Sequence, residues 1–180
     1  MFSGRAFPGF DNVDVLSLLA EAQEAAISGH LSQLPRVSTD SDTLAQIQHA
    51  ARKIFSYDPH QVLEAERALE DICDAAPSAV SMAWLLVANR VLMFERIATH
   101  SKEWVEALDM RCAQAIALGP TNAFLLAAVS GAYIRFLDRH DEGLALARRA
   151  VRLNPASPYA LDALAGALYL CGRYEEGYRL

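Results

Sequence analysis

Apolar residues recur three and four positions apart along most of the chain, which is the spacing of one face of an α-helix. Alternation of apolar and polar residues at period two is absent, so strands are not expected. Proline, glycine and polar clusters divide the pattern into segments. The predicted helices cover residues 13–28, 44–55, 61–75, 80–98, 103–118, 122–137, 142–153 and 158–170, and a further helix starts at 175. The predicted fold class is therefore all-α.

A polar linker separates the first predicted helix from the others. The apolar stripe of that helix consists of Val15, Leu18, Leu19, Ala22 and Ala26. Residues 34–43, LPRVSTDSDT, contain a proline and offer Asp42 or Thr43 as the N-cap of the next helix. We therefore expect two parts, an N-terminal helix and linker over 1–43 and a helical domain over 44–180.

The helices come in pairs, and a proline closes each pair. Pro120 and Pro155 are 35 residues apart, and Pro77 and Pro120 are 43 residues apart. The segments that lead into these prolines look alike: AERALEDICDAAP, ALDMRCAQAIALGP and GLALARRAVRLNP. Such a period indicates a repeat array in which each pair supplies the apolar face that its neighbour lacks. The alternative is a plain helical bundle whose helices happen to pair.

The C-terminal segments resemble tetratricopeptide repeats, whose unit is a helix–turn–helix of about 34 residues. Counted from Pro158, the signature positions four, seven, eight and eleven hold Leu161, Leu164, Ala165 and Leu168. The turn GRYEE at 172–176 is similar to the family's Gly–x–Tyr–x–Glu turn. The resemblance is closest over 122–177 and weaker over 80–120. Before Pro77, only the second helix of a unit matches the pattern. It implies a right-handed α-α superhelix of about three to four antiparallel helix pairs, the last one incomplete.

In that family the first helices of the units line a concave groove that binds other proteins. The resemblance therefore implies a protein-interaction scaffold rather than an enzyme. The candidate peptide-binding residues at groove positions are Asn89, Met93, Phe124, Ala128, Arg135, Tyr159 and Asp162, of which Asn89, Arg135, Tyr159 and Asp162 are expected to be exposed. For Met82, Leu85 and Leu86, at further groove positions, burial in the core is the competing interpretation.

The character of these residues indicates the partner. The groove positions are mostly apolar, and the lysines that the family's carboxylate-clamp version needs are absent, with Asn89 the single match. Binding of a chaperone-type C-terminal carboxylate is therefore not expected. We expect an apolar helix or extended segment, which methionine and aromatic surfaces accommodate.

Sequence motifs typical of catalytic, nucleotide-binding or metal-binding sites are absent. It contains no GxSxG, P-loop, GxGxxG, HExxH or EF-hand pattern, and no two histidines are three or four residues apart. Cys73, Cys112 and Cys171 form no CxxC pair and lie in apolar helical stretches, so core packing and a reducing compartment are expected. No catalytic residue, metal site or cofactor is predicted; an all-helical enzyme remains a minor alternative.

Charge and hydropathy restrict the partners further. A net charge of −6 disfavours direct binding to nucleic acid, which depends on Lys and Arg. The N-terminus lacks the pattern of a secretory signal, and the longest apolar run, 123–134, is too short to span a membrane. We therefore expect a soluble, cytoplasmic protein with a protein or peptide partner and no membrane contact. The alternative function is a regulatory or sensor region of a larger bacterial signalling or transcription-regulatory protein.

The apolar stripe Leu161, Leu164 and Leu168 is predicted to lack partners, because the chain ends before the second helix of that unit is complete. Exposed apolar surface of this kind favours association. A homodimer through the incomplete C-terminal repeat is therefore expected.

Overall fold

A computed structural model describes residues 41–56, 58–94 and 101–180, and every regular element in these ranges is helical. The elements are α2 (Ser41–Ile54), α3 (Pro59–Ala75), α4 (Ala79–Phe94), α5 (Lys102–Leu118), α6 (Ala123–Phe136), α7 (His140–Leu153), α8 (Pro158–Leu170) and α9 (Tyr174–Gly177). The all-α prediction is confirmed for the described part of the chain. These helices belong to one compact unit, Asp40–Leu180. The predicted helix 13–28 and most of the linker lie outside the described residues.

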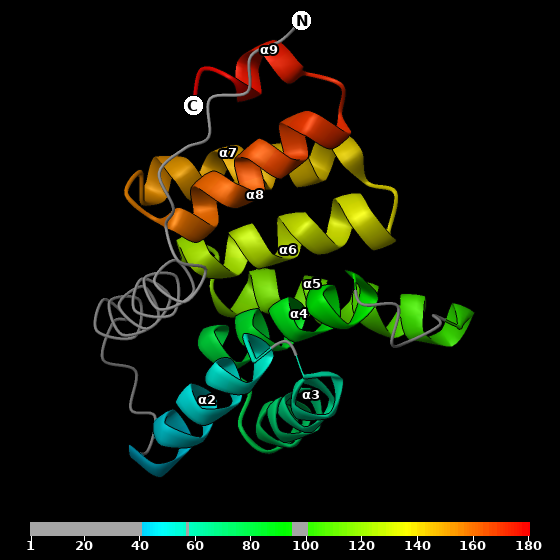
Figure 1. Ribbon diagram of the computed structural model, residues 1–180, viewed down its shortest axis with the longest axis vertical. Coiled ribbons are helices and arrows are strands. Elements are labelled where there is room, and N and C mark those ends of the chain that lie inside the picture. The colour runs from blue at the N-terminus through cyan, green and yellow to red at the C-terminus, as the bar shows by residue number, and fades with distance from the viewer. Residues whose placement is uncertain (1–40, 57, 95–100) are drawn as a thin grey trace, which may run out of the picture. The chain divides into compact units, whose positions relative to one another are not determined.

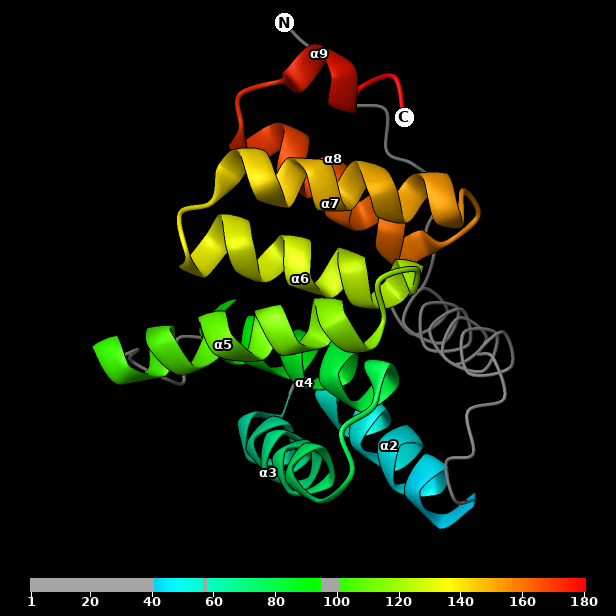
Figure 2. The ribbon, with the colours of Figure 1, turned by 180° about the vertical axis from the view of Figure 1, so that it is seen from behind.

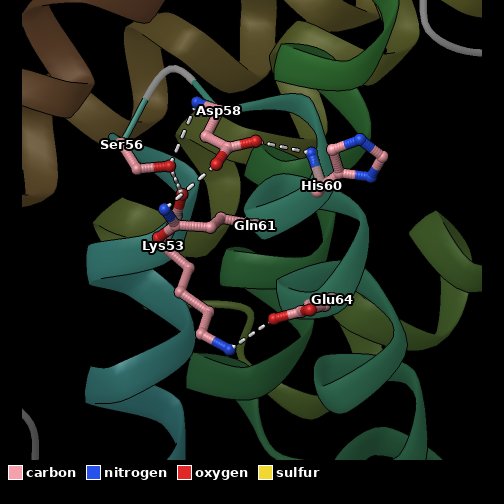
Figure 3. A network of polar contacts seen from close by, with 6 residues as sticks. All are labelled: Lys53, Ser56, Asp58, His60, Gln61 and Glu64. Carbon is pink, nitrogen blue, oxygen red and sulfur yellow. Dashed lines mark hydrogen bonds and ion pairs between the residues drawn. The ribbon is translucent and has the colours of Figure 1, made fainter.

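The observed boundaries are set by local capping. α2 begins at Ser41, three residues before the predicted start, so the last part of the predicted linker is helical. α3 begins at Pro59, because the Asp58 carboxylate accepts a hydrogen bond from the His60 amide at 2.9 Å. A proline in the first turn costs no hydrogen bond, since the amides there have no helical partner. An ion pair of 2.8 Å between Lys53 and Glu64 joins the two helices beside this turn (Figure 3).

Three later helices begin in the same way. The side chains of Ser101, Asn122 and Ser157 each accept a hydrogen bond from a backbone amide three residues on, at the starts of α5, α6 and α8. A side-chain cap of this kind contributes about 1 kcal/mol to helix stability. Polar residues before an apolar run thus fix where these helices start.

α6 lies at the centre of the packing. It contacts α4 and α8 on its sides and also α5 and α7. Figure 1 shows α4 and α8 in front of α5 and α7. Figure 2, seen from behind, shows α5 and α7 in front. Because α6 is covered from several directions, ten of its residues are buried. None of the helices described is both long and apolar enough to cross a membrane.

α6 and α7 approach each other closely at Gly143. A Cβ atom at this position would lie 2.4 Å from Ile134 Cγ1 and 3.1 Å from the Ser130 backbone oxygen. Ala147 and Ala150 continue the small-residue face of α7 and are fully buried. The small side chains of α7 therefore set the distance between these two helices.

Candidate functional site: a groove between α4, α6, α8 and α9

A groove of about 960 Å³ lies between the C-terminal halves of α4, α6 and α8 and the short α9. Its lining residues are Arg90, Met93, Ile134, Arg135, Ala165, Gly166, Tyr169, Leu170, Tyr174, Gly177 and Tyr178. The lining is mainly apolar or aromatic, and its two charged residues are both arginines. A concave, mostly apolar surface with a few polar groups is typical of binding sites.

Glycines make space for one of these arginines. A Cβ atom at Gly166 of α8 would lie 3.1 Å from Arg135 Nη2, and one at Gly131 of α6 would lie 3.5 Å from Arg135 Nη1. The half-buried Arg135 guanidinium therefore lies across the surface between α6 and α8. Burial lowers its pKa, and the nearby positive charge of Arg90 lowers the pKa further.

Arg90 is held by an acidic residue at the edge of the groove. Its Nη1 atom lies 3.2 Å from Oδ2 of Asp162 on α8. Arg90 is mostly covered, whereas Asp162 is exposed. The pair links α4 to α8 across α6, and it leaves the Asp162 carboxylate at the solvent boundary.

Tyrosines form the other side of the groove. Tyr169 of α8 and Tyr174 of α9 are in edge-to-face contact, with ring centroids 5.3 Å apart, and Tyr169 is 66% exposed. α9 can take this position because Gly172 adopts a φ of 71°, in the left-handed region that favours glycine. Glu176 then fixes α9 through hydrogen bonds with Arg173 at 2.6 Å and with Arg148 of α7 at 2.9 Å.

Of the seven predicted binding residues, Met93 and Arg135 line this groove. Asp162 lies beside it through its contact with Arg90 and is exposed, as predicted. Gly166, Tyr169 and Leu170 of α8 line it as well. The residues that line the groove or lie beside it come from α4, α6 and α8.

Phe124, Ala128 and Tyr159 lie elsewhere, around a much smaller depression between the N-terminal halves of the helices. The Phe124 ring packs against Trp84 and Tyr159, at centroid distances of 4.9 and 4.8 Å, and is buried. Burial also raises the pKa of Tyr159 to about 12. The prediction that Phe124 lines an open groove is wrong, because the aromatic rings fill that space themselves.

Asn89 is the clearest correction. Its side chain is only 2% exposed, and its Nδ2 group donates a hydrogen bond of 2.6 Å to Glu66 of α3. The predicted exposure in the groove is wrong because this face of α4 packs against α3. Met82, Leu85 and Leu86 are also buried, which confirms the core interpretation for them.

Arg90, Ala165, Tyr174, Gly177 and Tyr178 are groove residues that the sequence reasoning missed. Arg90 directly follows Asn89, so it is one position away from a residue that the sequence analysis predicted to line a groove. Tyr174 and Tyr178 follow the glycine turn and are four residues apart, which is the spacing of one helix face. That spacing is the signal that could have identified the two tyrosines.

The thiols of the described helices are placed for packing. Cys73 and Cys112 are buried, as predicted, and burial raises the pKa of Cys112 to about 12. A thiol with so high a pKa is protonated at neutral pH and is a poor nucleophile. In the described ranges, His, Cys, Asp and Glu side chains form no group of three or more that could hold a metal ion.

Comparisons of the chain with protein-family models and with curated proteins find no match. Function is therefore inferred from the groove itself. Its arrangement combines exposed tyrosines, aliphatic side chains and two arginines on a surface shared by four helices. Tyrosine and arginine are enriched at the energetic centres of protein interfaces.

Proposed function

We propose that this chain is a non-enzymatic protein-interaction module that binds an apolar peptide or helix in the groove between α4, α6, α8 and α9. The single observation that carries the proposal is the group of large apolar side chains exposed around a concave surface, among them Tyr169, Leu170 and Tyr174. Burial of such side chains by a partner provides binding energy, because it removes apolar area from water.

The proposal includes a tetratricopeptide-like right-handed superhelix. The contacts of α4 with α6 and of α6 with α8 support it, since first helices of successive units lie next to one another in such an array. The close approach of α6 and α7 at Gly143 supports it too, because small residues between the helices of a unit are part of the pattern. Three free cysteines are consistent with a cytoplasmic location, where thiols stay reduced.

Peptides selected on the full chain from a phage-displayed library of random dodecapeptides would test the groove. The double variant Tyr169→Ala/Tyr174→Ala is expected to lose affinity by about 10-fold or more, because truncated aromatic anchors cost about 2 kcal/mol. The control Met110→Ala/Leu118→Ala removes exposed apolar side chains from α5 instead, away from the groove, and is expected to bind normally. Selection of no peptide, or an equal loss in both variants, would contradict the proposal.

A homodimer is a second candidate, and the exposed apolar residues at the C-terminal end favour it. Tyr178 is 92% exposed, and Leu153, Leu170 and Leu180 are exposed as well. The residues differ from those predicted, because Leu164 and Leu168 are buried against neighbouring helices. A second copy of the chain would cover this apolar surface.

A further inference from the structure

The two arginines of the groove lie close together on one surface. The Cβ position at Gly131 is 3.5 Å from Arg135 Nη1 and 3.9 Å from Arg90 Cδ. Both side chains therefore extend over the same glycine of α6, one from α4 and one from α6 itself. The lowered pKa of Arg135, which partly results from the charge of Arg90, agrees with this proximity.

The local charge contrasts with that of the whole chain. The chain carries a net charge of −6, whereas the ionised lining residues of the groove are Arg90 and Arg135. Asp162 offsets part of this charge from the edge of the groove. Each guanidinium has several N–H donors, so it can bind a further carboxylate in addition to the contacts that it already makes.

We propose that the groove binds a peptide segment that carries an acidic side chain next to large apolar residues, with the carboxylate on Arg90 and Arg135 and the apolar residues against Tyr169, Leu170 and Tyr174. This inference rests on the proposed function and specifies its partner by charge complementarity. The ligand is a side-chain carboxylate of Asp or Glu within the segment. Binding of a C-terminal carboxylate is not expected, and Asn89, the single residue that matches the carboxylate-clamp type, is buried against Glu66 and is absent from the lining of the groove.

The first test changes the peptide and leaves the protein intact. Among dodecapeptides selected on the full chain, binders are expected to be enriched in Asp or Glu beside aromatic or aliphatic residues. Replacing that acidic residue by its amide should weaken binding about 10- to 100-fold, because a charge-assisted hydrogen bond is lost. Added salt should weaken the binding of the acidic peptide more than the binding of its amide form, because salt screens the interaction between charges. Amidation of the peptide C-terminus should leave affinity unchanged.

The second test changes the protein. Arg90→Gln and Arg135→Gln are each expected to reduce the affinity of the acidic peptide about 10-fold or more, and to reduce that of the amide peptide much less. Arg135→Lys should recover part of the affinity, because it keeps the charge but not the planar group of donors. Arg149→Gln, an exposed arginine of α7 outside the lining, is the control. Circular dichroism and thermal unfolding check that each variant is folded.

The outcomes separate the two proposals. Peptides that depend on Tyr169 and Tyr174 but tolerate both amide replacement and the arginine variants would overturn the acidic partner and leave the proposed function standing. A loss on C-terminal amidation as large as that on side-chain amide replacement would identify a chain terminus as the ligand, and would also overturn the inference. If no selected peptide depends on the tyrosines, both proposals fail.

Discussion

Glu66 of α3 and Asn89 of α4 form a polar contact between the two helices. The Asn89 Nδ2 group donates a hydrogen bond to Glu66. Asn89 Oδ1 accepts no hydrogen bond from the residues that the structure describes. Burial raises the pKa of Glu66, and the charge of Glu70 raises it further, while the hydrogen bond from Asn89 opposes both effects. The ionised form of Glu66 is therefore less favourable in the folded protein than in the unfolded chain.

Glu66→Gln is expected to stabilise the protein relative to the wild type at neutral pH. When folding raises the pKa of a carboxyl group, the unfolding free energy of the protein falls as the pH rises from the unfolded-state pKa through the folded-state pKa. An amide does not titrate, so the variant lacks this loss. Urea unfolding at a series of pH values from acidic to neutral should show the difference in unfolding free energy growing with pH. A difference that is constant over this range would contradict the assignment.

Glu64→Gln is the control with the opposite sign. The hydrogen bond and charge of Lys53 lower the pKa of Glu64, so its contribution to stability is present at neutral pH and is lost as the pH falls through the folded pKa. This variant should be slightly less stable than the wild type at neutral pH. The difference should disappear in acid.

Small residues determine how closely helices of this chain approach one another. Gly143 of α7 faces Ile134 and the backbone of Ser130 on α6 at distances that exclude a Cβ atom without movement. Gly131 of α6 differs, because its nearest neighbours are the long side chains of Arg135 and Arg90 at 3.5 and 3.9 Å. Two glycines in neighbouring helices thus have different roles, one in helix packing and one in groove geometry.

Gly143→Ala is expected to destabilise the protein by about 1–3 kcal/mol, the usual cost of inserting a group into a packed interface. Gly131→Ala is the matched control. It should be neutral or stabilising by up to about 1 kcal/mol, since alanine is the better helix former and the neighbouring arginines can shift. Chemical unfolding of both variants measures the effects, and equal stabilities would show that α6 and α7 do not meet at Gly143.

The helices were predictable from the sequence, because their signals are local. Proline, polar N-caps such as Asn122 and the apolar spacing place the helices of the described part within a few residues. The site was predictable only in part. Of the residues predicted for a binding groove, Met93 and Arg135 line the groove that the structure shows, but Asn89 and Phe124 do not. Their burial depends on Glu66 and Trp84, which come from other helices, and no local pattern reports which helix will cover a given face.

The proposed association of two copies concerns the whole described unit, and sedimentation velocity over a range of protein concentrations tests it. The sedimentation coefficient of the wild type should rise with concentration, because Tyr178 and Leu180 become buried between copies. Tyr178→Ser/Leu180→Ser should shift this rise to about 10-fold higher concentration or more, since full burial of one such side chain is worth about 1.5–3 kcal/mol. Met110→Ser/Leu118→Ser, whose exposed residues lie on α5, should behave as the wild type does. A wild-type chain that sediments as a monomer at the highest concentration would exclude the dimer and leave the C-terminal apolar surface available to a peptide partner alone.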